Sequence, residues 1–219
     1  MRCANESFAL RLLLGFGLAL FAMTGPVLAH PHVWVTVKSE VIYAPDGSVT
    51  GIRHAWSFDD MFSVYALQGI ENKTKGIYTR AELAPLADTN VTSLKEYNYF
   101  NYARIEGKKR KDAFTDPVDY WLDYTDQVLT LHFTLPLKAP VRARDLEIDV
   151  YDPEYFIDFG FNENDPVKLV NAPAQCTLAL VRPTDAVPSV QRLNKSFQAS
   201  EAFAGMGSHF ANKILLRCP

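Results

Sequence analysis

Two histidines, His30 and His32, flank Pro31 in the stretch PVLAHPHVWVTV. If processing frees the amine of His30, that amine and the His30 imidazole could chelate one metal ion together, and His32 could add a third nitrogen. Pro31 excludes a square-planar site built on deprotonated backbone amides, because proline has no amide hydrogen to lose. Any further ligands must therefore come from side chains elsewhere in the fold.

Two aspartates are candidates to face His32 across a hairpin. Residues 33–58 have the alternation of two strands around the turn APDG, and facing positions in an antiparallel hairpin have residue numbers with a constant sum. A four-residue loop places His32 opposite Asp59, whereas a three-residue loop with a glycine bulge places it opposite Asp60. The apolar pattern favours the first register and turn chemistry favours the second. Either carboxylate, with two histidines, gives a ligand set that suits zinc, nickel or copper(II) and suits calcium poorly.

A structural interpretation of the same residues is also open, in which His32 starts a strand and makes an ordinary hydrogen bond to an aspartate. His54 is a satisfied core residue in one register and a fourth ligand in the other. Asp152, in EIDVYDPEYF, is explained mostly by turn chemistry with Pro153, and we retain it as a further candidate metal ligand.

Residues 1–29 are interpreted as a signal peptide. Arg2 and Arg11 bracket its start, LLLGFGLALFAM is an apolar run, and VLA supplies small residues at a cleavage point after Ala29. The run is shorter than the roughly 20 residues of a spanning helix, and no later window replaces it. We therefore expect an exported, soluble protein that begins at His30 and does not span the membrane; an uncleaved anchor is the alternative.

Cleavage would remove Cys3 and leave Cys176 and Cys218, an even pair in a compartment where disulfides persist. We expect these two cysteines to form a disulfide that ties CTLALVRP to KILLRC. A thiol metal ligand or nucleophile has no support from a CxxC spacing.

The composition excludes several classes of function. The formal net charge is −3, so the chain lacks the basic field that nucleic acid demands. The only basic run, GKKRK at residues 107–111, is interpreted as an exposed hairpin tip. No serine or cysteine nucleophile motif and no glycine-rich phosphate loop is present, so we expect a binding protein rather than an enzyme.

The periodicity predicts an α+β fold that is mainly antiparallel β and sandwich-like. Residues 30–219 form a single β-rich domain in this interpretation, with a helix-loop-helix inserted at about 59–98 after the first hairpin. The first helix, in SFDDMFSVYALQGIE, has a start signal at Ser57 and Asp60. The second begins at the capping box TRAE and is interrupted near Pro85.

The loop between these helices, ENKTKGIYTRAE at residues 71–82, has the punctuation of an EF-hand. Lys73 and Lys75 occupy two of the ligand positions, and an ammonium group cannot donate a lone pair to calcium. We expect the shape of an EF-hand without the ion.

Seven segments together resemble a known family: AHPHVWV, HAWSFDDMFSVYALQG, ELAPLA, DPVDYWLDY, LTLHFTLPL, VYDPEYF and FANKILLRCP. Across nearly the whole mature chain they are similar to the bacterial domain-of-unknown-function family one thousand and seven, the periplasmic component of an uncharacterised ABC-type transport system. The resemblance implies a periplasmic protein acting beside nickel/cobalt-type permeases. The family's His-Pro-His maps onto residues 30–32 and its aspartate-proline motif onto Asp152 and Pro153, while Lys73 and Lys75 depart from an acidic loop in some relatives.

The leading hypothesis is a periplasmic accessory protein that binds a divalent transition metal (zinc, nickel, cobalt or copper) at His30 and His32 for a membrane metal permease or ABC-type transporter. The alternative is an interaction subunit that docks on a permease without holding metal. A copper oxidase built on the same histidines is a third hypothesis, for which the sequence offers no substrate groove.

Overall fold

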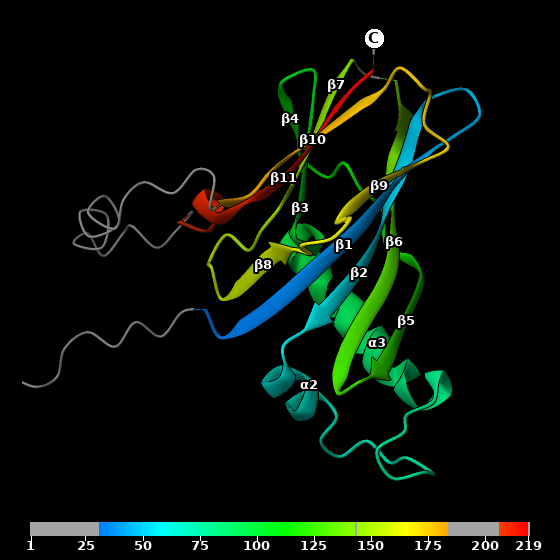
Figure 1. Ribbon diagram of the computed structural model, residues 1–219, viewed down its shortest axis with the longest axis vertical. Coiled ribbons are helices and arrows are strands. Elements are labelled where there is room, and N and C mark those ends of the chain that lie inside the picture. Colours follow the sequence, from blue (N-terminus) through cyan, green and yellow to red (C-terminus); the bar gives the residue numbers. More distant parts are fainter. Residues whose placement is uncertain (1–30, 143, 184–205, 219) are drawn as a thin grey trace, which may run out of the picture. The chain divides into compact units, whose positions relative to one another are not determined.

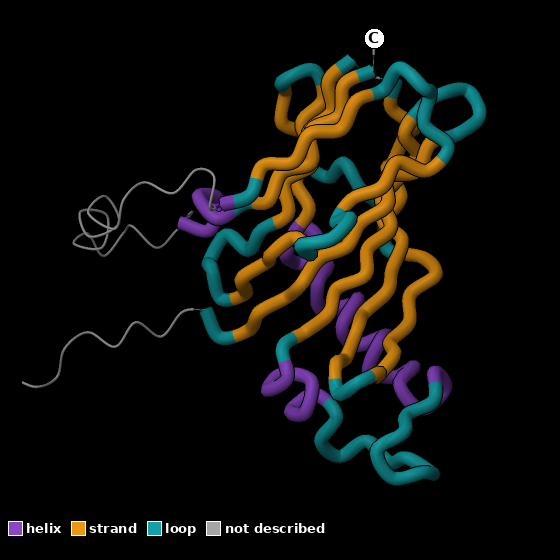
Figure 2. Tube along the Cα trace, viewed as in Figure 1, coloured by secondary structure: helices purple, strands orange, loops and turns teal. Residues whose placement is uncertain are grey.

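The structure is a computed structural model in which residues 31–142, 144–183 and 206–218 are described. The predicted cleavage site and His30 lie outside these residues. The part of the chain from Pro31 onward forms one compact unit of mostly antiparallel strands and a few helices (Figures 1 and 2). The predicted α+β class is thereby confirmed.

The larger sheet has the strand order β5-β6-β2-β1-β8, and β9 also pairs with β1. Neighbouring strands are antiparallel except that β8 and β9 run parallel to β1. Its strands are β1 (Val33–Tyr43), β2 (Val49–Phe58), β5 (Val118–Thr125), β6 (Val128–Val141), β8 (Ile157–Phe161) and β9 (Val167–Val170).

The smaller sheet is antiparallel throughout and has the order β10-β11-β7-β3-β4. Its strands are β3 (Asn101–Ile105), β4 (Lys108–Arg110), β7 (Asp145–Val150), β10 (Thr177–Val181) and β11 (Asn212–Arg217). The predicted disulfide, Cys176–Cys218, joins the start of β10 to the end of β11. Two 3-10 helices, η1 (Lys95–Phe100) and η2 (Met206–Phe210), precede β3 and β11.

Alternation along most of the strands sends apolar side chains into one core. The rings of Trp56 from β2, Phe133 from β6 and Phe159 from β8 meet there, with the Trp56 centroid 4.8 Å from each of the other two. Below this point the inner face of the larger sheet is covered by α3 (Arg80–Leu94), which buries Leu83, Ala87 and Val91 (Figure 1).

The two predicted helices are present, with corrected limits. The helix α2 is only Asp60–Ala66 and is capped by Asp59, so the predicted start at Ser57 is wrong. Ser57 lies in β2, where its hydroxyl bonds to Thr130 at 3.0 Å. The capping box of Thr79 and Glu82 at the start of α3 is confirmed.

The interruption predicted near Pro85 is wrong, because α3 continues through this residue to Leu94. Pro85 lies in the second turn, where it removes a single amide donor from the helix. The burial of Leu83, Ala87 and Val91 on the side of α3 that packs against β5 outweighs the loss of this one hydrogen bond. Among the described residues no helix combines the length and the apolar character needed to cross a membrane.

The loop between α2 and α3 has no EF-hand ligand geometry at its last position. Glu82 accepts hydrogen bonds from the Lys73 backbone (2.9 Å) and from the Thr79 backbone and hydroxyl (2.7 Å each). These bonds lower the pKa of Glu82 to about 2, and the two bonds from Thr79 contribute most to the shift. The carboxylate therefore closes the loop and caps the helix.

The first hairpin has the register expected for the three-residue loop only beside the turn. Tyr43 pairs with Val49 beside the turn, but a bulge between Ile42 and Tyr43 shifts the rest of the ladder, so that Val35 pairs with Phe58. Continued along the same ladder, Asp59 faces Trp34, and the two backbones bond from the Asp59 amide to the Trp34 carbonyl at 3.0 Å. The expectation that a carboxylate faces His32 directly is therefore wrong.

Candidate functional site

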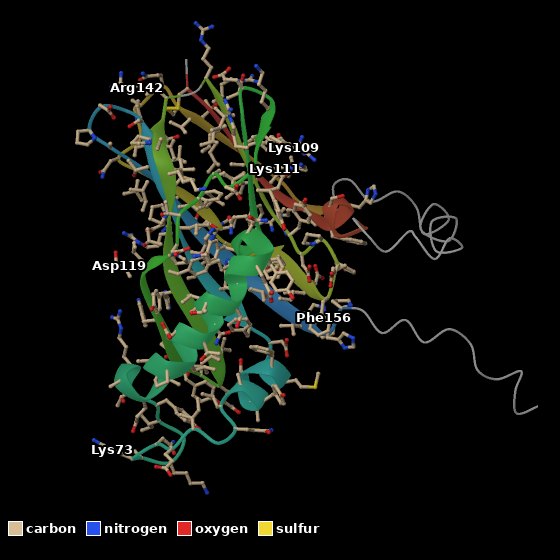
Figure 3. All side chains as sticks on the ribbon, turned by 180° about the vertical axis from the view of Figure 1, so that it is seen from behind. Lys73, Lys109, Lys111, Asp119, Arg142 and Phe156 are labelled. Carbon is tan, nitrogen blue, oxygen red and sulfur yellow. A yellow bond between two sulfur atoms is a disulfide. The ribbon has the colours of Figure 1, made fainter. Side chains whose placement is uncertain are left out.

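His32 lies at the exposed start of the larger sheet, one residue before β1. Its backbone amide donates to the Phe156 carbonyl at 2.9 Å, and its ring centroid lies 4.7 Å from that of Phe156. His32 and Trp34 (45 % exposed) lie on the outer face of the sheet, because the alternate residues Val33 and Val35 point into the core. The ring of Phe156 (46 % exposed) lies beside that of His32. Figure 3 shows Phe156 at this end of the sheet, close to the start of β1. The fold thus presents the His32 imidazole on a surface with a firmly held backbone.

Asp59 is already occupied by two hydrogen bonds. Its Oδ2 accepts from the Trp34 amide and its Oδ1 accepts from the Phe62 amide, each at 2.9 Å. The residue ends β2, holds the first strand and caps α2 at the same time. Asp60, in the first turn of α2, is exposed and makes no ion pair with any residue the structure describes.

Asp152 organises the loop before β8. It is 4 % exposed, and its carboxylate accepts from the amides of Glu154 (2.9 Å), Phe156 (2.9 Å) and Ile157 (3.0 Å). The turn interpretation of this residue agrees with these bonds. Asp152 acts on His32 indirectly, because it positions the backbone of Phe156.

Gly207 of η2 packs against the same loop. Its amide donates to the Pro153 carbonyl at 3.1 Å, and a Cβ at this position would lie 1.6 Å from the Asp152 carbonyl oxygen. Only glycine allows this approach of the two backbones. The helix η2 therefore packs against the loop that supports His32 and stabilises it.

His54 is the central member of a buried polar cluster. Its ring nitrogens lie 2.9 Å from the Ser39 hydroxyl and 3.1 Å from the Asn101 side-chain oxygen. Burial lowers the pKa of His54 to about 3, against the opposing hydrogen bond to Asn101. The ring is neutral and satisfied, so the core interpretation of His54 is confirmed and a role as fourth ligand is excluded.

Serine, histidine and asparagine in one row have the composition of a nucleophile, a base and an orienting group. All three are closed to substrate, however, with 3 %, 1 % and 2 % exposure for Ser39, His54 and Asn101. We therefore assign these three residues a structural role in the core. It was missed from the sequence, although Ser39 among the valines of β1 was a visible signal.

His132 belongs to a layered group on the outer face of the larger sheet. Its Nε2 lies 2.7 Å from the Asp123 carboxylate, and its ring stacks on Trp121 with centroids 3.9 Å apart. The guanidinium of Arg80 covers the same indole at 4.7 Å. These contacts fix the imidazole between strands, away from His32.

No group of three or more histidine, cysteine, aspartate or glutamate side chains within the described part of the chain could hold a metal ion. The structure does not bring Asp59 or Asp152 to His32 as available ligands, since their oxygens bind backbone amides. A metal site at this end of the sheet therefore needs groups from His30 to complete it.

Comparison with known proteins assigns nearly the whole chain to a family. The family model described as "Protein of unknown function (DUF1007)" matches residues 15–218. The chain is also 30 % identical over 95 residues to the "Uncharacterized 15.5 kDa protein in trpE 3'region" of Spirochaeta aurantia. That alignment covers 43 % of this chain and 66 % of the relative, slightly less than two thirds of its length.

Proposed function

The chain belongs to the DUF1007 family, whose function is unknown, and we propose that it is a periplasmic accessory protein that captures a divalent transition metal for a membrane transport system. The metal is cargo in this proposal, and zinc, nickel, cobalt and copper(II) are the candidates that nitrogen ligands suit. The observation that carries the proposal is the exposed imidazole of His32, held at the start of β1 directly after His30 and Pro31.

The arrangement favours a ligand set centred on the two histidines. The hydrogen bond to the Phe156 carbonyl fixes the backbone at His32, so its imidazole has a defined place on the surface. His30 supplies a second imidazole and, after cleavage, an amine. Asp60 is the carboxylate that remains available nearby in the sequence, whereas Asp59 and Asp152 are held by amides.

Metal titration of the purified protein tests the proposal. Zinc, nickel and copper(II) are titrated into untagged protein with a mass-verified N-terminus, and into His30→Ala and His32→Ala variants. We expect each variant to bind at least about tenfold more weakly, and binding to weaken on acidification as imidazoles and the amine take up protons. His132→Ala is the matched control, since that imidazole is held by Asp123 and Trp121. Unchanged affinity in both amino-terminal variants would remove the proposal.

An interaction subunit without metal is the second candidate, and a specific surface favours it. Around His32 the sheet exposes Trp34 and Phe156, and α2 beside it exposes Met61 (70 %) and Tyr65 (67 %). Exposed aromatic and methionine side chains are typical of docking surfaces, here for a permease or an ABC-type transporter subunit. Elemental analysis of untagged protein purified from the periplasm separates the two candidates, because only the first predicts bound metal.

A further inference from the structure

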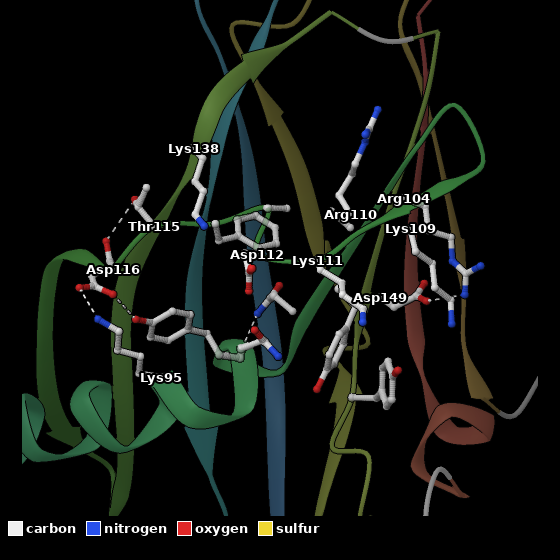
Figure 4. A pocket seen from close by; sticks show the side chains of 18 residues that line it. Lys95, Arg104, Lys109, Arg110, Lys111, Asp112, Thr115, Asp116, Lys138 and Asp149 are labelled. Atoms are coloured by element: carbon white, nitrogen blue, oxygen red, sulfur yellow. Dashed lines mark hydrogen bonds and ion pairs between the residues drawn. The ribbon is translucent and has the colours of Figure 1, made fainter.

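A second feature of the molecule lies away from His32, where the smaller sheet meets the end of β6. The residues of η1, β3, β4, β7 and the loop after β4 surround a cleft of about 790 Å³ (Figure 4). This volume lies within the roughly 300–1,000 Å³ that is usual for small-molecule sites. Its walls are joined by backbone bonds, since the Lys138 amide donates to Ala113 and the Thr115 amide donates to Pro136, each at 2.9 Å.

The cleft gathers positive charge in a chain whose formal net charge is −3. Six cationic and three acidic residues line it: Lys95, Arg104, Lys109, Arg110, Lys111, Lys138, Asp112, Asp116 and Asp149. Lys95 pairs with Asp116 at 2.8 Å, and Arg104 approaches Asp149 at 3.6 Å. Among the described residues the other four cations have no ion pair, and Asp112 is the one carboxylate left to oppose them.

Edge protection explains only part of this charge. Lys109 and Arg110 lie on β4, an edge strand, where cations discourage pairing with another sheet. The predicted exposed tip at residues 107–111 is confirmed in this respect. Lys111 follows the strand, however, and Lys138 belongs to the larger sheet, yet both line the same cleft from different walls (Figure 4). Convergence of cations from two sheets points to an anion.

Four aromatic side chains also line the cleft. The rings of Tyr102 and Tyr151 lie with centroids 4.5 Å apart, and Phe114 and Tyr99 are buried. The Tyr99 hydroxyl donates to Asp116 at 2.7 Å, which fixes that wall. Burial raises the pKa of Tyr102 and of Tyr151, so both phenols are protonated at neutral pH. A ligand in the cleft would therefore meet aromatic rings as well as ammonium and guanidinium groups.

We propose that this cleft binds a small organic or inorganic anion carrying at least two acidic groups, carboxylates or phosphates, between Lys111 and Lys138. The limited volume favours a small molecule over a polymer, and the acidic balance of the whole chain disfavours nucleic acid. The cations without an ion pair among the described residues supply charge-assisted hydrogen bonds, and the aromatic side chains of the lining supply apolar contact. This site is independent of the metal proposed at His32.

Calorimetric titration with citrate and with inorganic pyrophosphate tests the cleft. The protein is first stripped of metal on a chelating resin, so that the result does not depend on the metal proposal. We expect binding of one of the two probes, weakening with added salt, and no binding of acetate at the same concentration. Preference for citrate or pyrophosphate identifies the acidic group. Absence of binding by both probes would overturn the proposal.

Paired variants separate a site from general charge. Lys111→Gln with Lys138→Gln should weaken binding at least about tenfold. Lys75→Gln with Lys108→Gln removes the same charge from residues that do not line the cleft and should change affinity less than about twofold. Equal losses in the two double variants, or no loss in the first, would show that the cleft is not the binding site.

Discussion

The two sheets share one apolar core, but one polar cluster on the larger sheet is buried and neutral, whereas one on the smaller sheet is partly exposed and ionic. On the larger sheet His54 points inward, is neutral and bonds to Ser39 within its own sheet and to Asn101 across the core. On the smaller sheet a cluster of charged residues on β3, β7 and β11 remains paired as ions. Lys213 of β11 contacts Glu147 at 2.7 Å and Asp149 at 3.0 Å.

The difference follows from solvent access. A fully buried imidazole cannot keep a charge without a counter-ion, so burial lowers the pKa of His54 and the ring remains neutral. Lys213 retains 30 % side-chain exposure and can remain an ion beside its partners. Even here burial, followed by the neighbouring Glu147, raises the pKa of Asp149. The fully buried polar group of the larger sheet is therefore neutral, whereas the half-buried cluster of the smaller sheet remains ionic, and a disulfide joins two strands of the smaller sheet.

Removing the disulfide should have the largest effect, and it should fall on the smaller sheet. The disulfide joins two cysteines that are 42 residues apart in the sequence. The loss of loop-closure entropy predicts that the double variant Cys176→Ser, Cys218→Ser lowers the free energy of unfolding by about 4 kcal/mol. Urea denaturation measures the loss, and hydrogen exchange should rise in β10 and β11 more than in β2 and β6. A reducing agent should leave the double variant unchanged. A loss below about 1 kcal/mol would contradict the assignment of this sheet's stability to the disulfide.

Truncating His54 tests the larger sheet in the same way. His54→Ala should lower the free energy of unfolding by about 3 kcal/mol, because it opens a cavity and leaves Ser39 and Asn101 without their partner. His132→Ala is the matched control and should cost about 1 kcal/mol or less, because that ring lies at the surface of the same sheet. Equal losses in urea denaturation would show that burial does not distinguish the two histidines.

Local signals in the sequence predicted most of the fold. The capping box at Thr79 and Glu82, the alternating valines of β1 and the even cysteine pair each depend on neighbours in sequence or on simple counting. The predicted register of the first hairpin was wrong because a bulge beside Tyr43 shifts all the pairs between this residue and the start of β1. A bulge depends on how the strand fits the rest of the sheet, and the turn residues alone do not reveal it.

The candidate site was harder to predict for the same reason. Because of the shift Asp59 faces Trp34 instead of His32, and Asp59 caps α2 in place of the expected start signal at Ser57 and Asp60. The basic cleft could not be seen at all, because Lys138 is distant in sequence from Lys109, Arg110 and Lys111. Only the packing of two sheets brings such residues together.

Acid should weaken the larger sheet before the smaller one is affected. The pKa of His54 is about 3 in the folded protein and near 6.5 when the chain unfolds, so its contribution is complete above pH 6.5 and is lost as the pH falls towards 3. The expected loss is about 2 kcal/mol between pH 7 and pH 5. Asp46 and Glu82, whose pKa values are lowered to about 2 by hydrogen bonds, add losses only below their ordinary values of 3.8 and 4.5.

Urea denaturation at several pH values measures this dependence. A His54→Gln variant has no group that titrates in this position and should lose the slope between pH 7 and pH 5. The cluster of Lys213, Glu147 and Asp149 should not add to this loss. The raised pKa of Asp149 makes that group more favourable to folding as the pH falls, and the lowered pKa of Glu147 adds a loss only below its ordinary value of 4.5. A wild-type stability that is flat over this interval would contradict the neutral, buried state of His54.

The smallest effect concerns Asp59, at the exposed end of the larger sheet, where stability and the proposed function can be separated. Asp59→Ala removes the acceptor for the Trp34 and Phe62 amides and should cost about 1 kcal/mol in the free energy of unfolding. Asp59→Asn keeps one oxygen to cap α2 at Phe62 but places an NH2 group, which cannot accept, opposite the Trp34 amide, so it should cost about 0.5 kcal/mol. Both variants should bind zinc, nickel and copper(II) as the natural protein does, because the carboxylate serves amides rather than metal. A loss of metal affinity in Asp59→Asn, while the fold keeps nearly all of its stability, would mean that this carboxylate leaves the Trp34 and Phe62 amides to bind the ion, and that the end of the larger sheet rearranges around its cargo.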